Sequence, residues 1–500
     1  MPLIDLLSRQ PTAALAILSP ERPPLTYGSL AGLAGRTVAA LNGRGIGRRD
    51  RVAVVLPNGP DMAAAFLAIG AGAATAPLNP AYRADEFDFY LRDLSPKALV
   101  VQAGVETPAR EAARKLDIAV IELVPDQAAA GLFRLDIPAA SGAPSFSSPE
   151  DDALLLHTSG TTSRPKLVPL SQQNILASAK HISGTLALAP ADRCLNIMPL
   201  FHIHGLIGAT LSTIAAGGSL FCTPGFNALK FFAWLEESQP TWYSAVPTMH
   251  QAILARAERN REILERRRLR FIRSSSASLP APVMMELESV FGCPVIESYG
   301  MTEASHQMTS NPLPPAARKP GSVGRAAGPE VAILSEDGQK LPPGETGEVV
   351  IKGPNVTSGY VANDSANAAA FTDGWFRTGD QGVFDAEGYL TITGRLKELI
   401  NRGGEKVSPL EVDAVLLGHP AVAQAVTFAL PHDKLGEEVG AAIVLREGAA
   451  LTERELRDFA AQRLADFKVP RRVLFLEEIP KGATGKLQRI GLAAKLGLGA

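Results

Sequence analysis

The sequence predicts an α/β protein with a large N-terminal domain of helix-covered, mostly parallel sheets, a small β-rich subdomain, and a small α+β C-terminal domain. Three observations predict this fold class. Short β-rich runs alternate with helical runs in the first part of the chain, which is the pattern of βαβ units. The residue pattern changes near Val331 and again over Arg395–Gly404. The length of 500 residues is enough for about three compact units with a large buried core.

The N-terminal domain is predicted to span residues 1–395. Apolar runs predict buried strands at Arg51–Pro57, Lys97–Ala103, Ile118–Leu123 and Asp152–Gly160. Met62–Pro77 carries no charge but is shorter than the ~20 residues of a spanning helix, so it predicts a buried helix followed by a strand. Residues 126–150 are rich in Ala, Pro and Ser and predict a surface connection.

Two further units follow. Short strands separated by Gly, Pro and Asp turns predict a β-rich subdomain over residues 331–395. Residues 396–500 are predicted to form the α+β unit. Its first helix begins at Ser408, with Glu411 completing a capping box and Gly418 as the stop. A second capping box pairs Thr452 with Glu455.

Composition narrows the class of function. Forty-nine basic residues against 51 acidic ones give a formal charge of −2, which argues against a nucleic-acid partner and against polybasic membrane binding. Cys194, Cys222 and Cys293 form no close pair, which argues against a disulfide framework or a cysteine-rich metal site. The N-terminus lacks the pattern of a signal peptide, and the C-terminus is not an SKL-type address. We therefore expect a cytoplasmic protein.

The strongest motif is HTSGTTSRPK, residues His157–Lys166, which follows an apolar strand. Its hydroxyls, glycine and two cations can offer hydrogen-bond donors and positive charge to a polyphosphate. A P-loop does not fit, because Pro165 stands where the second glycine belongs and Leu167 where Ser or Thr belongs. The alternative is a polar surface turn.

Three weaker motifs follow in the chain. Glu297–Glu303 places an aromatic beside a glycine, with a hydroxyl and a carboxylate that can serve a phosphate and Mg²⁺. Thr378-Gly379-Asp380 offers a carboxylate in a turn, suited to two ribose hydroxyls. Pro480–Lys486 predicts a flexible loop that contains two glycines and ends in a lysine. Such a lysine can carry a positive charge into a catalytic site and out of it again.

Together and in this order, the four motifs resemble the adenylate-forming superfamily of acyl-CoA synthetases, luciferases and peptide-synthetase adenylation domains. The resemblance covers nearly the whole chain. Its phosphate loop normally reads TSGTTGxPKG, and here Ser163 and Leu167 replace two glycines. The YGxTE, TGD, GRxKE and PxxxxGK elements match.

The resemblance implies a two-step ligase. A carboxylate attacks the α-phosphorus of ATP to give an acyl-adenylate and pyrophosphate, and a thiol, usually of coenzyme A, then displaces AMP. Partners would be these small molecules, with the protein a monomer or homodimer. The implied nucleotide-binding residues are Thr158, Ser159, Gly160, Thr161, Thr162 and Lys166 at the β- and γ-phosphates; Tyr299 on adenine, with Ser276, Ala277 and Ser278 opposite; Glu297 and Ser298 beside them; and Asp380 and Arg395 at the ribose.

The resemblance also implies the catalytic groups. Thr302 would touch the α-phosphate, Glu303 would bind Mg²⁺, and Lys486 would bridge the substrate carboxylate and the α-phosphate. Lys397 would be the hinge of a mobile C-terminal domain. After adenylation this domain would bring Arg402, Gly403 and Gly404 to a coenzyme A channel.

Within the superfamily the chain is most similar to the oxalate–CoA ligases. The matching stretches are HTSGTTSRPK, Met198–Leu206, Phe271–Leu279, Met301–Pro314 and Lys319–Gly324. Polar groups at His202, Ser276 and His306 are predicted to surround oxalate, because an alkyl chain would leave such groups unpaired. His204, Ser274 and Ser275 could add to this pocket, or His204 could brace the fold.

Alternatives remain for the acid and for the class of protein. Malonyl-CoA synthetases share the Phe-His-x-His-Gly pattern but carry an arginine just before YGMTE, where this chain has Ser298. A medium-chain or aromatic acid is a third possibility. A non-catalytic nucleotide-binding relative is the alternative from another class, against which Thr302, Glu303 and Lys486 argue.

Overall fold

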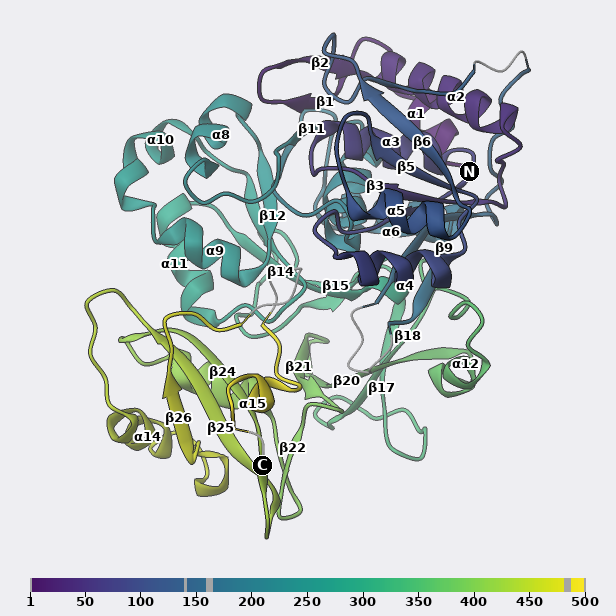
Figure 1. The fold of residues 1–500 in the computed structure, drawn as a ribbon. Helices are drawn as coiled ribbons and strands as arrows, with labels where there is room; N and C mark the ends of the chain where they lie inside the picture. Colours follow the sequence, from purple (N-terminus) through teal and green to yellow (C-terminus); the bar gives the residue numbers. More distant parts are fainter. Residues whose placement is uncertain (1, 139–141, 159–164, 481–486, 499–500) are drawn as a thin grey trace.

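The structure is a computed structural model that describes residues 2–138, 142–158, 165–480 and 487–498. Within these residues the strands form two large sheets of mainly parallel strands and two smaller, mainly antiparallel sheets. Figure 1 shows the large sheets in the purple-to-teal N-terminal part, and the yellow-green C-terminal part as a separate lobe. The α/β class predicted from the sequence is confirmed.

In the part of the chain described, the first large sheet has the strand order β7-β6-β5-β3-β4-β8-β9. Its members are β3 (Arg51–Val55), β4 (Ala74–Pro77), β5 (Ala98–Gln102), β6 (Ala119–Pro125), β7 (Phe133–Leu135), β8 (Asp152–His157) and β9 (Leu167–Ser171). The central strands are parallel, whereas the edge strands β7 and β9 are antiparallel to their neighbours. α4 (Ala84–Leu94) and α5 (Pro108–Lys115) pack on one face. The four predicted strands are present.

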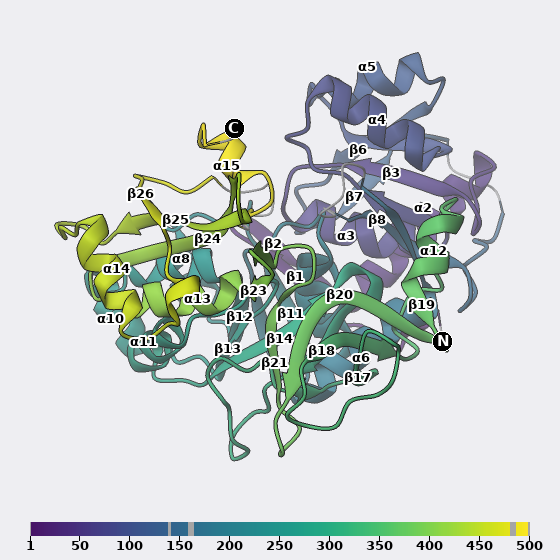
Figure 2. The same ribbon diagram turned by 90° about the horizontal axis from the view of Figure 1, so that it is seen from below.

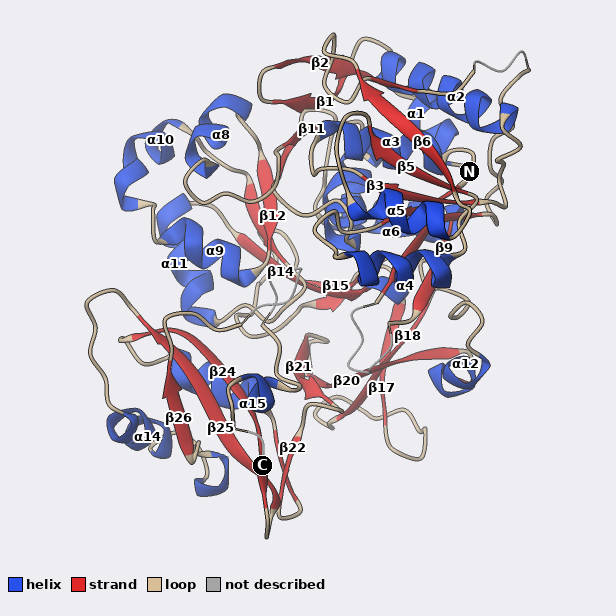
Figure 3. Ribbon diagram, in the orientation of Figure 1, coloured by secondary structure: helices blue, strands red, loops and turns tan. Residues whose placement is uncertain are grey.

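The second large sheet has the order β16-β15-β14-β13-β12-β10-β11-β1-β2 among the described residues. Its members are β1 (Leu15–Ser19), β2 (Arg22–Thr26), β10 (Arg193–Asn196), β11 (Ser219–Cys222), β12 (Trp242–Ala245), β13 (Phe271–Ser274), β14 (Val295–Met301), β15 (His306–Ser310) and β16 (Arg325–Ala326). One face is covered by α8 (Phe231–Ser238), α9 (Pro247–Leu254), α10 (Arg261–Arg266) and α11 (Ala281–Phe291), with η2 (Glu258–Asn260) between α9 and α10. Figure 3 shows these blue helices outside the red strands.

The main core lies between the two large sheets. α3 (Pro60–Gly70) packs there against strands of both, and its residues from Met62 to Gly70 are buried. This explains the uncharged stretch, which is a helix with no solvent face followed by β4. The other helices that pack around α3 or between the sheets are α1 (Leu3–Ser8), α2 (Tyr27–Gly43), α6 (Gln172–Thr185), η1 (His204–Leu211) and α7 (Ser212–Ala215). No helix of the described residues is both long and apolar enough to cross a membrane.

The two smaller sheets occupy the C-terminal third of the chain. The first contains β17 (Glu330–Leu334), β18 (Gly347–Lys352), β19 (Phe371–Thr372), β20 (Trp375–Phe384) and β21 (Leu390–Arg395), with α12 (Asp364–Ala370) beside it. The second contains β22 (Ile400–Arg402), β23 (Glu405–Val407), β24 (Val422–His432), β25 (Gly436–Leu445) and β26 (Arg472–Phe475), with α13 (Pro409–Leu417), α14 (Glu453–Ala461), η4 (Asp466–Lys468) and α15 (Leu492–Lys495). The second view, in Figure 2, shows α13 and α14 on one side of β24 and β25, and α15 on the other.

The two predicted capping boxes differ. At α14, Thr452 and Glu455 close the box in both directions, as predicted. At α13, Ser408 accepts a hydrogen bond from the Glu411 amide at 3.3 Å, but the Glu411 carboxylate accepts from Lys468 Nζ at 2.7 Å. The box predicted at Ser408 is therefore half formed, because a long-range ion pair takes its second member.

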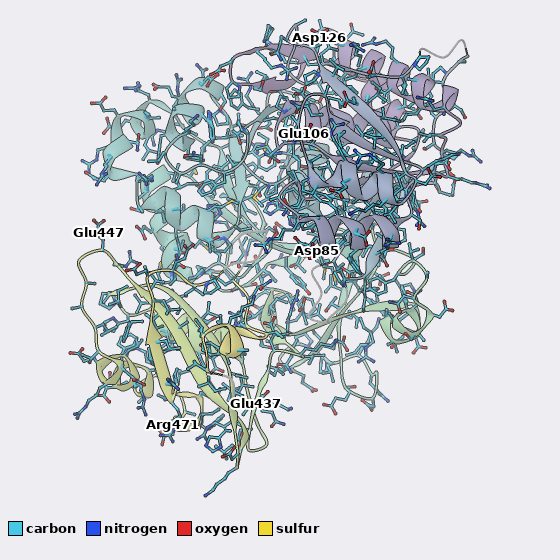
Figure 4. All side chains as sticks on the ribbon, in the orientation of Figure 1. Asp85, Glu106, Asp126, Glu437, Glu447 and Arg471 are labelled. Atoms are coloured by element: carbon cyan, nitrogen blue, oxygen red, sulfur yellow. The ribbon has the colours of Figure 1, made fainter. Side chains whose placement is uncertain are left out.

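Charged side chains project from the surface of both lobes (Figure 4). Asp85, Glu106 and Asp126 stand on the N-terminal part, and Glu447 and Arg471 on the C-terminal part, all exposed.

Candidate functional site

The carboxyl ends of β13 and β14, beside β12, bring the segment after Ser274 and the Glu297–Glu303 motif to one edge of the nine-stranded sheet. These three strands are parallel neighbours, and Ser274 on β13 pairs with Glu297 on β14. The segment after β13 carries Ser276, and the end of β14 carries Tyr299, so residues far apart in sequence meet here. In open α/β sheets, ligands bind at the carboxyl ends of the parallel strands.

Tyr299, Asp380 and Arg395 form one hydrogen-bonded group at this edge. The Tyr299 hydroxyl donates to one oxygen of Asp380, and Arg395 Nε lies 3.1 Å from the other. Asp380 and Arg395 face each other because β20 and β21 pair at these residues. Asp380 is 5% exposed, whereas the Arg395 side chain is 47% exposed. Burial, together with the Asp380 charge, raises the pKa of Tyr299, so its hydroxyl stays a donor.

The segment after β13 forms an open wall near Tyr299. Ala277 and Ser278 are exposed, and Ser276 has a left-handed φ of 76°. Ser275 Oγ donates to the Ser298 carbonyl at 3.0 Å, which ties this segment to β14. The Ser298 hydroxyl is itself turned inward, 3.4 Å from the Ser274 carbonyl.

Glu297 supports this wall from below. It is buried, and one carboxyl oxygen accepts a hydrogen bond from the Leu279 amide at 2.8 Å. Burial raises its pKa to about 8, so the group is protonated at neutral pH. The neutral Glu297 side chain therefore stabilises the segment after β13 through the Leu279 amide. This role does not depend on any contact of Glu297 with a nucleotide.

Thr158, Lys166 and Glu303, which the sequence predicts at the phosphates and the metal ion, are linked through short contacts. Thr158 N donates to the Lys166 carbonyl at 2.9 Å, which closes the base of the HTSGTTSRPK loop. Lys166 Nζ lies 4.4 Å from the centroid of the Tyr360 ring, and the Tyr360 hydroxyl donates to Glu303 at 2.9 Å. Ser159, Gly160, Thr161 and Thr162 lie outside the described residues, as does Lys486.

Glu303 is a buried carboxylate, 6% exposed, in η3 (Thr302–Ala304). Burial raises its pKa, while hydrogen bonds and the charges of Lys166 and Arg395 oppose that rise. Thr302, on the same short helix, is partly exposed. The described residues hold no cluster of three or more metal-ligating side chains. A single carboxylate beside a phosphate site is what Mg²⁺ uses when substrate phosphates supply its other ligands.

Two buried histidines, His204 and His306, and the partly buried Ser276 form a polar cluster. His204 Nδ1 lies 3.0 Å from Ser276 Oγ, and its Nε2 lies 2.6 Å from Ser244 Oγ. The His204 and His306 rings are 4.9 Å apart. The sequence hypothesis paired His202 with Ser276 and His306; the histidine placed against Ser276 is His204. His202 packs its ring on Phe201, with centroids 4.8 Å apart.

Glycines make room for this histidine pair. η1 is a π-helix that begins at His204, and π-helical turns are frequent at functional sites. A Cβ on Gly208 of η1 would collide with the His306 ring and reach 3.1 Å from His204. Gly300 is required as well, because a Cβ there would overlap the His306 carbonyl at the irregular step in β14–β15 pairing. His306 itself has φ 103°.

Sequence reasoning missed three residues of the site: Ser244, which lies 2.6 Å from His204 Nε2, Arg273 and Tyr360. Arg273 Nη1 lies 3.0 Å from His306 Nε2, and Tyr360 joins Lys166 to Glu303. Arg273 left a signal, since a charged residue inside a short apolar strand is seldom buried without a reason. Tyr360 left none, because its role depends on a contact 57 residues away in sequence.

The predicted hinge and coenzyme A residues lie where β21 passes into β22. Lys397 is exposed in the turn between them. Gly403 and Gly404 form the tight turn of the β22–β23 hairpin with φ of 60° and 99°, and Arg402 pairs with Glu438 at 2.6 Å. The turn alone accounts for two glycines.

Comparisons with known proteins place this geometry in context. The AMP-binding enzyme family matches residues 7–361, and the AMP-binding enzyme C-terminal domain matches residues 411–486. An oxalate–CoA ligase of Arabidopsis thaliana is 47% identical over 474 residues, which cover 93% of this chain and 92% of that protein. An oxalate–CoA ligase of Saccharomyces cerevisiae is 44% identical, covering 88% of this chain and 86% of that one.

Solved structures agree with these relatives. ATP-bound MatB from Rhodopseudomonas palustris is 31% identical, covers 99% of both chains and superposes with a TM-score of 0.90. The apo form of the same protein gives 0.81. The arrangement described here is therefore closer to the ATP-bound form of that protein than to its apo form.

Proposed function

The chain belongs to the AMP-binding enzyme family and is an AMP-forming acid–CoA ligase that uses ATP and coenzyme A, and on this premise we propose that its acid is oxalate. The observation that carries the proposal is the polar cluster in which the buried His204 and His306 meet Ser276. Both ring nitrogens of His204 and Nε2 of His306 already have hydrogen-bond partners in this cluster. A short diacid offers such polar groups acceptors with which to exchange hydrogen bonds, whereas a hydrocarbon chain offers none. The two oxalate–CoA ligase relatives support the same acid.

For the first half-reaction we infer a division of roles among the residues. Tyr299 stacks on adenine opposite Ser276, Ala277 and Ser278, and Asp380 with Arg395 receives the ribose hydroxyls. Their existing hydrogen bonds support this, since Asp380 already accepts from a hydroxyl and a guanidinium. The proposed phosphate ligands are Thr158, Ser159, Gly160, Thr161, Thr162, Lys166 and, at the α-phosphate, Thr302.

The acid carboxylate then attacks the α-phosphorus, and pyrophosphate leaves with the P–O bond electrons. Lys486 is proposed to stabilise the negative charge that accumulates there; loss of a comparable donor costs about 3 kcal/mol. Mg²⁺ would be held by Glu303, whose buried carboxylate lacks a cation of its own within hydrogen-bond distance among the described residues. The ion would neutralise phosphate charge.

For the second half-reaction we propose that residues 396–500 move as a unit relative to residues 1–395, of which 331–395 form the β-rich subdomain. Lys397 is the proposed hinge, and its exposure in a turn between two separate sheets supports that role. Movement would bring Arg402, Gly403 and Gly404 to coenzyme A, whose thiolate displaces AMP from the adenylate.

Malonate is the second acid to test. Ser298 stands where malonyl-CoA synthetases carry an arginine, and its hydroxyl is turned toward the Ser274 carbonyl. No cation stands at that position, which favours the shorter diacid.

The proposed compartment is the cytoplasm, which the three buried, free cysteines support.

An acid panel tests the proposal. AMP release would be measured with ATP, coenzyme A and, in turn, oxalate, malonate, succinate, acetate and octanoate. We expect the highest kcat/KM for oxalate, by about tenfold or more over malonate. A higher value for malonate or octanoate would reject oxalate as the substrate, and no AMP release with any acid would indicate a nucleotide-binding relative without ligase activity.

A further inference from the structure

Arg273 is a buried cation with no acidic partner among the described residues. It lies in β13 and is 0% exposed. Nη1 lies 3.0 Å from His306 Nε2, and Nη2 donates to Gln307 Oε1 at 3.2 Å, while Nε meets no hydrogen-bond partner in the part of the chain that the structure describes. Within the described part of the chain Arg273 forms no ion pair with an aspartate or glutamate. Burial lowers its pKa to about 9, which still leaves it charged at neutral pH.

An uncompensated buried charge is costly for a folded protein. Arg273 therefore has a reason to be retained other than stability. Its surroundings indicate what that reason is, because the buried histidine pair lies on the same face of the sheet.

Each of the two histidines is bound by a side chain from one of two neighbouring strands. Ser244 on β12 and Arg273 on β13 are register partners, so their side chains lie on one face. Ser244 holds Nε2 of His204, and Arg273 holds Nε2 of His306. A guanidinium only donates hydrogen bonds, so Nε2 of His306 must accept. The His306 ring is consequently neutral, with its proton on Nδ1.

We propose that Arg273 is a positioning and specificity-determining residue that fixes the tautomer of His306 and supplies the positive field that favours a second carboxylate in the acyl pocket. This inference rests on the proposed function, because it deepens the account of how the acid is chosen. Arg273 acts through His306 and through its charge. The acid would therefore be selected by its charge as well as by its size.

Oxalate and oxamate separate these two properties. Oxamate replaces one carboxylate of oxalate by an amide, so its shape is nearly the same but its charge is −1 instead of −2. The ratio of kcat/KM for oxalate to that for oxamate measures the preference for the second charge. Because it is a ratio, it does not depend on the fraction of enzyme that is active.

The test compares Arg273→Met, Arg273→Gln and Arg273→Lys with wild type in AMP release. We expect the oxalate-to-oxamate ratio to fall about tenfold or more in the two neutral variants, through KM for oxalate, and to be largely kept in Arg273→Lys. KM for ATP should stay within about twofold. Arg193→Met, the same change on β10 at a guanidinium bound to Ser219 and Ser238, should leave the ratio unchanged.

Thermal unfolding separates specificity from bracing. Removing an uncompensated buried charge should keep or raise the Tm of Arg273→Met, even as oxalate is disfavoured. A lower Tm with equal losses for oxalate and oxamate would mean that Arg273 only braces β13 and β15, and would overturn the inference. Should Met not fold, the Gln and Lys variants give the same comparison.

The outcomes also distinguish this inference from the proposed function. An unchanged ratio in the neutral variants of an enzyme that uses oxalate would overturn the inference alone. If wild type prefers malonate, the proposed acid is wrong and the inference is judged by malonate against its monoamide. A wild type that activates octanoate but neither diacid would overturn both.

Discussion

The proposed nucleotide region and the proposed acid region of the site differ in how their side chains are held. In the nucleotide region, Asp380 is bound by Tyr299 and by an Arg395 side chain that is half exposed. In the acid region, His204, His306 and Arg273 are at most 2% exposed and are held from the sheet behind them. The first region is a set of groups along an open edge. The second is a packed part of the core.

This difference indicates which residues serve nucleotide binding in general and which determine the choice of acid. Groups along an open edge can bind the same nucleotide in every member of a family, with little dependence on what lies behind them. Groups in a close-packed core depend on their neighbours to within a methyl group. Changes in the nucleotide region should therefore affect every acid equally, whereas changes in the acid region should alter the choice of acid.

The largest effect is expected from Lys486→Ala. Losing the cation at the reacting phosphate should lower the rate of adenylation about a hundredfold for every acid. Thioesterification of supplied acyl-adenylate should largely persist, because Lys486 is proposed to serve the first half-reaction only. Both steps would be followed separately, by pyrophosphate release and by acyl-CoA formation. Equal loss in both steps would contradict the assigned role.

Substitutions of the histidines test whether the buried cluster affects the acid and leaves ATP binding unchanged. His204→Ala and His306→Ala are each expected to lower kcat/KM for oxalate about tenfold to hundredfold, because buried partners lose a hydrogen bond. His202→Ala should cost less than His204→Ala. Steady-state kinetics with oxalate and with ATP check this, and ATP KM should not change. A larger loss for His202→Ala would restore His202 as the residue of the pocket.

Gly208→Ala tests whether the histidine pair needs the space beside it, and the substitution removes no polar group. The added methyl would collide with the His306 ring, and overpacking of this kind costs about 1–3 kcal/mol. We expect kcat/KM for oxalate to fall about tenfold with ATP binding retained.

The matched control is Gly35→Ala in α2, where an added methyl would meet no atom within 4 Å. It should leave oxalate kinetics unchanged. If both variants behaved alike, space for the histidine pair would not be what Gly208 provides.

The smallest effect on activity is expected from Glu297→Gln. Its pKa is raised by burial to about 8, from 4.5, so the folded state holds this proton over a pH range in which the unfolded state has lost it. The wild type is therefore destabilised progressively as pH rises from about 4.5 to about 8. Glutamine removes that dependence but can still accept from the Leu279 amide.

Thermal unfolding of both proteins across pH checks this prediction. Glu297→Gln should match wild type below pH 4.5, gain Tm relative to it up to about pH 8, and show no further gain above. Acid selectivity should not change. A raised ATP KM would instead show that Glu297 contacts the nucleotide.

The sequence predicted the parts of the molecule whose signals are local. Apolar runs located β3, β5, β6 and β8, and the uncharged stretch located α3 and β4. The proposed nucleotide motif at Glu297–Glu303 could be recognised because Tyr299, at the end of β14, and Glu303, in η3 directly after it, are close in sequence. The half-formed box at Ser408 was missed because Lys468, 57 residues away, takes the Glu411 carboxylate.

The acid region was less predictable, for a physical reason. His204 meets Ser276 across 72 residues, and Arg273 meets His306 across 33, through strand register and a π-helix that periodicity does not reveal. Sequence pattern indicated that polar groups converge there. Which histidine meets Ser276, and that a cation stands behind the pair, follow only from packing.

Activation of oxalate by ATP is tested most directly by ATP–pyrophosphate exchange with oxalate as the sole acid and no coenzyme A. We expect exchange that depends on oxalate, saturates with it, and persists without the thiol. Exchange supported by a fatty acid but absent with oxalate would show that oxalate is not the acid of this ligase.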